Sequence, residues 1–306
     1  MGKIIVPHLF LRLMTDLTLA GVFSILTAIS TGTFSIIVRQ GRYYGNAYTG
    51  VLIGLIISVP LLLLLTYFTW EPHWWNLDAL IKLSVAGFLG PAVGRVLYFS
   101  GIHYLGVSRA MPLTSTMPLF ATIFGVLFLG ERPGPFIWFG TLLIVSGCIS
   151  ITYKKESDSS WNRKYVWIPF VAVLSLSFSH VFRKTGVMIV NSPLLAITIM
   201  STSGLFFLVL FSRLFPLVQR PNLKNYQAWK FYTFSGLLNT TSVFFHFVGL
   251  NYGDLSIVTP LSSMAPFFAL LFSRAFFREE EKITFFIVIG TLLIVIGGMI
   301  ISWRIF

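Results

Sequence analysis

The chain has 306 residues, of which 56% are hydrophobic and 10% are charged, and its net charge is +12. A soluble globular domain carries about a quarter charged residues, so the composition excludes one and predicts an all-α membrane protein. The basic residues lie mostly near the ends of apolar segments, where lysine and arginine bind anionic lipid headgroups. We therefore expect membrane lipid, and no nucleic acid, as their partner.

Ten apolar windows are long enough to cross a bilayer, because a spanning helix needs about 20 apolar residues. In chain order they are predicted at residues 16–38, 46–69, 79–103, 108–129, 135–153, 165–185, 193–215, 228–250, 254–276 and 283–303. The stretch 154–164, KKESDSSWNRK, is polar and is predicted to link the fifth window to the sixth. We expect one five-helix repeat over residues 1–153 and a second over residues 165–306.

The two halves carry the same sequence pattern. In the fourth window Ser108 is followed by proline, serine and proline at steps of four, three and three residues, and Ser256 starts the same pattern in the ninth. The fifth and tenth windows then contain GTLLIVSG from Gly140 and GTLLIVIG from Gly290. Repeats with an odd number of helices enter the bilayer from opposite faces, so two inverted five-helix repeats are predicted. Such repeats, with proline-interrupted helices, are typical of secondary transporters that bind substrate between the halves.

The prolines of this pattern remove backbone hydrogen bonds inside the membrane, where free carbonyls are tolerated only beside protein or a water-filled cavity. Ser115 and Ser263 lie on the same helical face as the first proline of their copy. We expect both serines to line a central cavity. The alternative is that the prolines make packing kinks and that the serines join neighbouring helices.

Residues 101–147 and 249–298 resemble the signature of the ten-helix EamA-like family of the drug/metabolite transporter superfamily. The first stretch has a helix that opens on small residues, then proline, then a leucine-rich helix that ends in LGE at 129–131. In the second stretch FRE at 277–279 takes the place of LGE. The resemblance implies a secondary transporter, usually an exporter of small metabolites. It also implies a central cavity lined by the third, fourth, eighth and ninth helices together with the first and sixth.

The resemblance implies that both termini are cytoplasmic, and the short loops indicate a multi-pass protein of a prokaryotic plasma membrane. The basic residues point the other way. With a cytoplasmic N-terminus, the predicted inner segments hold seven lysines and arginines and the outer segments fourteen. The positive-inside rule then favours both termini outside. We follow the resemblance, because several of these residues lie at helix ends, and helix ends are the part of a helix that sequence predicts least accurately.

No carboxylate lies in the middle of a predicted window, because every Asp and Glu falls at a helix end or in a loop. The related four-helix multidrug exporters use a first-helix glutamate to exchange protons for organic cations. The first window here offers hydroxyl groups instead, among them Thr31. We expect no antiport of that design and take Thr31 as a candidate substrate contact.

Arg95 is the one permanent charge deep inside a predicted window, with Tyr98 one turn further along. A charge at the bilayer centre costs about 2.5–3.5 kcal/mol, so Arg95 should face the cavity. We expect it to bind an anionic group of the substrate, such as a carboxylate, which the guanidinium fork fits. The alternative is a structural arginine that bonds freed carbonyls or reaches the interface.

His246 aligns with Tyr98 in the second repeat, and it shares one face of the eighth window with Asn239 and Ser242. His180 lies on the sixth window. We expect these side chains to line the same space as Arg95. Histidine titrates near physiological pH and could relay a proton; the alternative is a neutral histidine that is hydrogen-bonded between helices.

A membrane enzyme is the alternative from another class, but the sequence has no GxSxG or HExxH motif and no paired aspartates. We expect no catalytic residue, no metal site and no cofactor. A passive uniporter or a lipid flippase on the same fold stays open, because sequence does not set direction or coupling. The expected partners are a small-molecule substrate, amino-acid-like, amphipathic or anionic, and membrane lipid. The protein would act as a monomer or homodimer, with proton coupling as a further candidate property.

Overall fold

The structure is a computed structural model that describes residues 5–41, 43–71, 76–105, 107–152, 163–211, 221, 223–277 and 285–303. Within these residues every regular element is a helix. Seven segments are long and apolar enough to cross a membrane, and the shorter apolar helix Pro135–Ile151 is an eighth. Trp167–Val190 and Tyr226–Tyr252 bring the described spans to ten. The predicted all-α membrane fold with ten transmembrane helices is confirmed.

The first half contributes five spans, one of them continuous through a π-helical segment and one interrupted. They are α1 (Ile5–Gly41), α2 (Ala47–Phe68), α3 (Leu77–Gly87) with η2 (Phe88–Gly94) and α4 (Arg95–Leu105), α5 (Val107–Thr114) with α6 (Met117–Leu129), and α7 (Pro135–Thr152). The second half begins with a short 3-10 turn, η3 (Arg163–Tyr165), and has five spans as well. They are α8 (Trp167–Val190), α9 (Pro193–Phe211), α10 (Tyr226–Tyr252), α11 (Leu255–Ser262) with α12 (Ala265–Phe277), and α13 (Phe285–Ser302). Most of the predicted linker lies outside the described residues.

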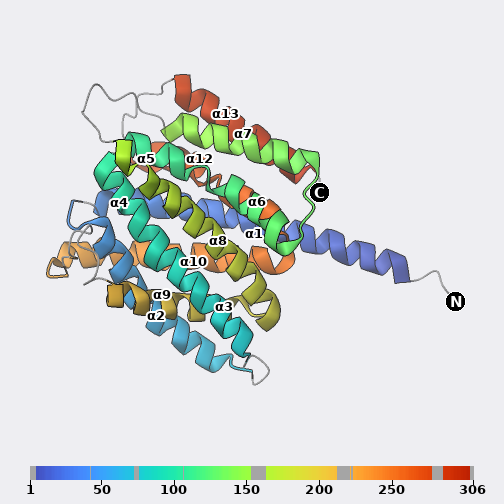
Figure 1. Cartoon of the computed structure of the whole chain (residues 1–306), viewed down its shortest axis with the longest axis horizontal. Helices are drawn as coiled ribbons and strands as arrows, with labels where there is room; N and C mark the ends of the chain where they lie inside the picture. The colour runs from blue at the N-terminus through green and yellow to red at the C-terminus, as the bar shows by residue number, and fades with distance from the viewer. Residues whose placement is uncertain are drawn as a thin grey trace.

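The spans form one bundle in which helices of the two halves alternate (Figure 1). α7 and α13 lie together along one edge, and α2 lies at the opposite edge beside α9. α8 runs across the middle and contacts α3, α4 and α6 of the first half as well as α10 of the second. α1 packs along α10, and its N-terminal end extends beyond the bundle. The centre is therefore built from both halves.

Helices α7 and α13 pack on each other through glycines of the duplicated sequence. A Cβ on Gly147 would lie 2.5 Å from the carbonyl oxygen of Gly290, and one on Gly140 would lie 2.8 Å from that of Gly297. Alignment of the two repeats pairs Gly140 with Gly290 and Gly147 with Gly297. Exchanging the two halves therefore converts each of these contacts into the other. Contacts that exchange in this way lie about a twofold axis, which is the geometry of the predicted inverted repeats.

The fourth and ninth spans are broken at matching positions, residues 115–116 and 263–264. The second proline of each copy, Pro118 or Pro266, is the second residue of the following helix, where its missing N–H leaves no helical bond unmade. Discontinuous helices in corresponding positions of two halves are typical of transporters with a substrate site at their interface.

The third span stays continuous but widens into the π-helical segment η2 around Pro91. Proline has no N–H to donate and its ring clashes with the preceding turn, and a wider turn accommodates both effects. The segment ends where the backbone N–H of Arg95 donates to the carbonyl of Gly90. Arg95 therefore follows directly on the irregular segment.

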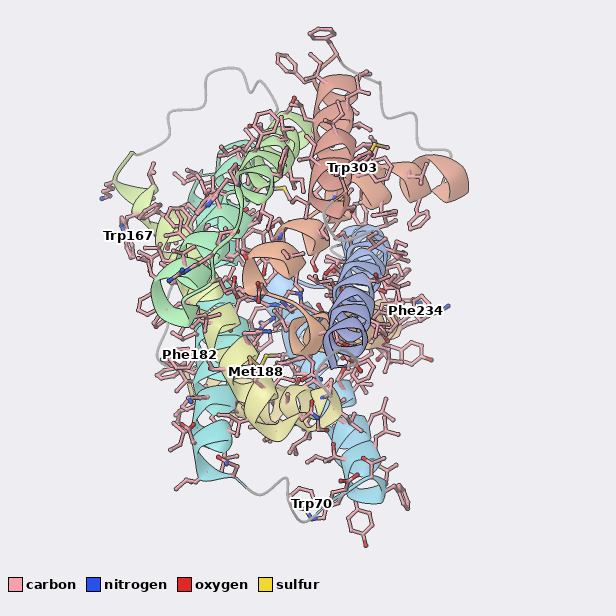
Figure 2. All side chains as sticks on the ribbon, turned by 90° about the vertical axis from the view of Figure 1, so that its right-hand side faces the viewer. Trp70, Trp167, Phe182, Met188, Phe234 and Trp303 are labelled. Atoms are coloured by element: carbon pink, nitrogen blue, oxygen red, sulfur yellow. The ribbon has the colours of Figure 1, made fainter. Side chains whose placement is uncertain are left out.

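α8 and α10 are absent from the spans that qualify by composition, because polar residues interrupt them. Many of these residues are buried: Ser177, Ser179, His180 and Lys184 on α8, and Ser235, Ser242 and His246 on α10. Figure 2 shows large apolar side chains around the outside, among them Met188, Phe234 and Trp303, which are 61%, 57% and 88% exposed. The two helices thus cross the membrane with their polar groups held against protein.

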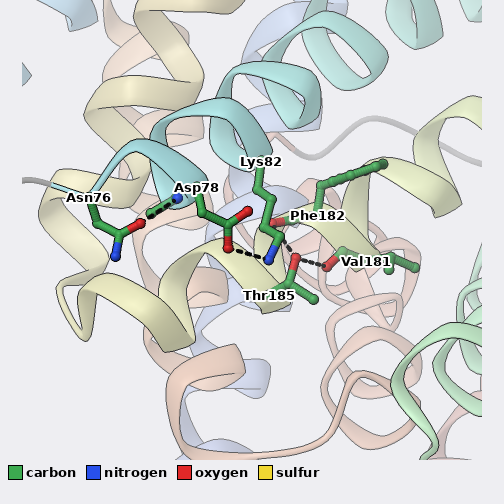
Figure 3. Close-up of polar contacts among 7 residues, drawn as sticks. Asn76, Asp78, Lys82, Val181, Phe182 and Thr185 are labelled. Atoms are coloured by element: carbon green, nitrogen blue, oxygen red, sulfur yellow. Dashed lines mark hydrogen bonds and ion pairs between the residues drawn. The ribbon is translucent and has the colours of Figure 1, made fainter.

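Figure 3 shows the start of α3 beside α8. Asn76 caps α3 by accepting a hydrogen bond from the N–H of Ala79 (3.1 Å), and Lys82 forms an ion pair with Asp78 (2.6 Å). The two charged side chains are 31% and 61% exposed. An exposed pair contributes at most about 1 kcal/mol, so this contact orders a helix end without joining the halves.

Candidate functional site

Arg95 on α4 reaches α10 across the interface between the halves. Its Nη2 donates a hydrogen bond to Oδ1 of Asn239 (3.0 Å), and both side chains are half-buried. Tyr98 lies one turn further along α4, is also half-buried, and packs against Phe99 with 5.1 Å between ring centroids. Two of the predicted site residues, one from each half, are thus in direct contact.

His246 on α10 and His180 on α8 form a second contact. Nε2 of His246 lies 3.0 Å from Nδ1 of His180, and Nδ1 of His246 lies 3.3 Å from Oγ of Ser262. The two histidines are 4% and 7% exposed. In an imidazole pair one ring nitrogen donates and the other accepts. The pair therefore has one N–H between two buried rings.

Thr31 and Ser242 form a third contact, between α1 and α10. Their hydroxyl oxygens lie 2.6 Å apart, and Ser242 also donates to the carbonyl oxygen of Thr27 (3.1 Å). Ser242 is buried and Thr31 half-buried. Because Ser242 donates to the carbonyl, its hydroxyl accepts the proton of Thr31. The first predicted window thus supplies a hydroxyl to the same face of α10 as Asn239.

Ser115 and Ser263 stand at the two helix breaks and bond back into their own helices. The hydroxyl of Ser115 donates to the carbonyl oxygen of Met111 (3.0 Å), and that of Ser263 to the carbonyl oxygen of Thr259 (2.8 Å). Both side chains are half-buried. Among the described residues neither serine bonds to another predicted site residue, so their part in substrate binding stays a prediction.

Sequence reasoning missed two interior basic residues, Arg183 and Lys184. The window predicted at 165–185 puts them at a helix end, whereas α8 continues to Val190. The signal for the true end is Asn191, which has a positive φ of 49° and stands two residues before Pro193. Left-handed asparagine and a following proline both mark a helix C-terminus.

Lys184 has a structural role. Its side chain is buried, and Nζ donates to the carbonyl oxygens of Leu250 and Gly253, each at 2.7 Å. These carbonyls lie at the C-terminal end of α10, where a positive charge is favourable. The ammonium group therefore closes α10 and fastens it to α8.

Arg183, the neighbouring residue, is bonded far less. Its Nε is buried and has no hydrogen-bond partner among the described residues. Its positive charge acts on Arg95, His180 and His246. Arg183 thus lies close enough to couple electrostatically with both the arginine contact and the histidine contact.

Glu131, in the loop after α6, caps α11 of the other half. Oε1 accepts a hydrogen bond from the N–H of Leu255 (2.7 Å), and Oε2 accepts one from the N–H of Ser256 (2.8 Å). Burial raises the pKa of Glu131 above its ordinary value, and hydrogen bonds from Ser256 and Leu255 offset part of the shift. A carboxylate at a helix N-terminus is favourable, so the loop of the first half holds the broken helix of the second.

The interior accordingly offers two guanidinium groups, two imidazoles and several hydroxyls. Across the part of the chain that the structure describes, Arg95 and Arg183 form no ion pair with a carboxylate. No group of three His, Cys, Asp or Glu residues in the same described ranges could hold a metal ion. A set of this kind is suited to binding an anion.

The sequence model of the EamA-like transporter family matches residues 18–153 and, a second time, residues 163–303. The chain belongs to this family. It is therefore an integral, multi-pass membrane protein of the EamA-like branch of the drug/metabolite transporter superfamily. The resemblance seen in residues 101–147 and 249–298 is confirmed.

Two bacterial proteins are similar in sequence to this EamA-like chain. The uncharacterized transporter sll1319 of Synechocystis sp. is 27% identical over 179 residues, which are 51% of this chain and 54% of that protein. The permease-like protein YdzE of Bacillus subtilis is 31% identical over 72 residues, which are 24% of this chain and 92% of that protein. The chain thus aligns with about half the length of the first relative.

A solved structure, described as the crystal structure of a protein, shares the fold. It superposes with a TM-score of 0.73 at 15% identity, and the match covers 93% of this chain and 96% of the other. At this level of identity the likeness extends to the fold alone. The arrangement of ten helices is thus one that nearly the whole of another chain adopts.

Proposed function

We propose that this EamA-like protein is a secondary active transporter that exports small anionic or amphipathic metabolites, amino-acid-like compounds among them. The observation that carries the proposal is the Arg95 guanidinium, which bonds Asn239 between the halves and has no acidic partner among the described residues. A charged side chain inside a membrane protein costs free energy, and such residues mark functional sites. A guanidinium bonds carboxylates through two parallel hydrogen bonds.

In this proposal Arg95 binds the anionic group of the substrate, and Asn239 keeps the guanidinium oriented toward it. Tyr98, Ser242 and Thr31 offer an aromatic ring and hydroxyls beside that position. Residues 1–153 and 165–306 act as the two moving halves, joined by 154–164. Inverted halves have two nearly equivalent arrangements, one open to each face of the membrane, so rocking one half against the other exposes the site in turn.

Protons are the coupling ion that we propose, with the His180–His246 contact as the carrier. The two neutral rings can take up one further proton and share it through the hydrogen bond between them. The positive charge of Arg183 opposes this uptake, so an anionic substrate beside Arg183 would favour it. An imposed pH gradient across proteoliposomes should then drive substrate accumulation. Indifference to the gradient would instead favour a uniporter, and movement of a labelled lipid between leaflets would favour a flippase.

Transport by the purified protein tests the role of Arg95. Proteoliposomes are assayed with labelled amino acids and small carboxylic acids for the wild type, Arg95→Lys, Arg95→Ala and the exposed-loop control Arg132→Ala. We expect both Arg95 variants to lose affinity for the anionic substrate, alanine more than lysine, and the control to match the wild type. Unchanged affinity in both Arg95 variants would eliminate the proposed anion site.

We further propose a plasma-membrane location with both termini cytoplasmic, as in the family. We propose that the protein acts as a monomer or a homodimer. Single cysteines in a Cys148→Ser background test the orientation, because Tyr43 follows the first span and Trp303 the last. An impermeant thiol reagent should label Tyr43→Cys on intact cells and Trp303→Cys only after permeabilisation. The reverse pattern would place the termini outside, as the basic residues suggest.

A further inference from the structure

Arg183 occupies space that a missing side chain provides. A Cβ on Gly90 would lie 3.0 Å from Nη2 of Arg183 and 2.8 Å from Oγ of Ser179. Contacts this short require a neighbour to move, so glycine at position 90 leaves room for the guanidinium beside η2. The arginine therefore lies between α8 and the irregular part of the third span, directly before Arg95.

The two guanidinium groups are near each other and uncompensated. Arg183 and Arg95 repel each other electrostatically, and across the described residues neither forms an ion pair. Lys184 shows the contrast, since its charge is bonded by two carbonyl oxygens. Two like charges inside a membrane protein are strongly unfavourable without an anion. Repulsion of this kind is relieved when one ligand brings negative charge to both groups.

α10 contacts the surroundings of both arginines. Asn239 contacts Arg95, and His246 contacts His180, which stands one turn from Arg183 on α8. Asn239 and His246 are seven residues apart on one helix, about 10 Å along its axis. Groups spread along α10 in this way can contact a short carbon chain whose ends bind the two arginines. A compound with a single anionic group would leave one of the two positive charges uncompensated.

We propose that the transported compound carries two anionic groups, as a small dicarboxylate does, and that Arg95 binds one group and Arg183 the other. This rests on the proposed function, because it assumes that Arg95 is a substrate contact. Arg183 is then the residue that separates dianions from monoanions. Gly90 leaves room for its guanidinium, and the hydroxyls of α10 and the imidazoles of His246 and His180 would lie along the carbon chain.

Binding of matched acids tests the proposal. The protein in lipid nanodiscs is titrated calorimetrically at pH 7 with butyrate and succinate, and with hexanoate and adipate, so that each pair differs by one carboxylate. The variants are Arg183→Gln, Gly90→Ala, Arg95→Gln and the exposed-loop control Arg132→Gln, each checked for an unchanged melting temperature. Gly90→Ala perturbs the same place from the other side, because its methyl group would lie 3.0 Å from Nη2 of Arg183 and requires the guanidinium to shift slightly.

Wild-type protein should bind the dicarboxylate of at least one pair about tenfold or more tightly than its monocarboxylate, since one added charged hydrogen bond contributes about 1.5–3 kcal/mol. Arg183→Gln should abolish this preference and Gly90→Ala should reduce it, and both should leave monocarboxylate binding within about threefold. Arg95→Gln should weaken both acids, and Arg132→Gln neither. Two results would overturn the dianion proposal but leave the anion site at Arg95 intact. One is a preference for dicarboxylates that survives in Arg183→Gln. The other is Arg95-dependent binding in which monocarboxylates bind as tightly as dicarboxylates. Wild-type protein that binds none of the four acids would overturn the anion site as well.

Discussion

The contact between Glu131 and α11 gives a sharp prediction about stability. Glu131→Ala removes two hydrogen bonds, of 2.7 and 2.8 Å, from the N–H groups of Leu255 and Ser256. Loss of a helix cap costs about 0.5–2 kcal/mol, and a buried donor left without a partner costs about 1–3 kcal/mol. Removing a buried charge offsets part of this loss. We therefore expect the free energy of unfolding to fall by about 2 kcal/mol.

Reversible unfolding in mixed micelles of detergent and SDS, followed by tryptophan fluorescence, measures this change. Asp78→Ala is the matched control, because it also removes a hydrogen-bonded carboxylate, but one whose side chain is 61% exposed. The control should lose less than about 1 kcal/mol. If Glu131→Ala is no less stable than Asp78→Ala, the Glu131 carboxylate does not hold α11, and its contact with the second half contributes little to stability.

Three further predictions concern the same scaffold. Because burial raises the pKa of Glu131, the folded protein holds this proton more tightly than the unfolded chain does. Wild-type stability should therefore decrease as the pH rises from about 4.5 through the raised pKa, and Glu131→Gln should lack this step in pH-dependent unfolding. Lys184→Met leaves two carbonyl oxygens at the end of α10 without their donor, so it should lower the free energy of unfolding by about 1–3 kcal/mol. A loss of less than about 0.5 kcal/mol would contradict the structural role of Lys184. Gly147→Ala places a methyl group 2.5 Å from the carbonyl oxygen of Gly290 and should lower the free energy of unfolding by about 1–3 kcal/mol in the same assay. Leu142→Val, on the exposed face of α7, should leave the stability nearly unchanged. Equal effects of the two variants would contradict the close packing of α7 on α13.

The ten spans and their inversion follow from features that a sequence carries locally. Apolar length sets the number of helices, and proline spacing fixes where the fourth and ninth spans break. The breaks at 115–116 and 263–264 lie inside the predicted windows, next to the repeated prolines. The glycines of the duplicated GTLLIV stretch also proved to be the closest approach between α7 and α13. Such features do not depend on which helices become neighbours.

The contacts within the centre depend on tertiary packing and could be predicted only in part. Alignment of the repeats pairs His246 with Tyr98, yet the partner of His246 is His180 on α8. Helical spacing puts Asn239 and Ser242 on one face, but it does not say that one meets Arg95 and the other Thr31. Residues far apart in sequence meet because α8 and α10 lie in the middle of the bundle.

Arg183 illustrates why a hydropathy window fails at the centre of a transporter. Such a window favours helices that are apolar all round, and these face lipid. The helices that build a polar interior are less apolar, so a hydropathy window predicts them too short. An arginine inside such a helix is then assigned to its end. The stop signal at Asn191 and Pro193 is independent of hydropathy and places Arg183 inside α8.

Accessibility of the centre from both faces tests the account most directly. Asn239 is half-buried beside Arg95, and Asn239→Cys in the Cys148→Ser background introduces a single thiol there. In oriented proteoliposomes, an impermeant thiol reagent should modify this cysteine both when it is added outside and when it is trapped inside. A thiol in folded protein that reacts from neither face, or from one face alone, would contradict alternating access through the space between the halves.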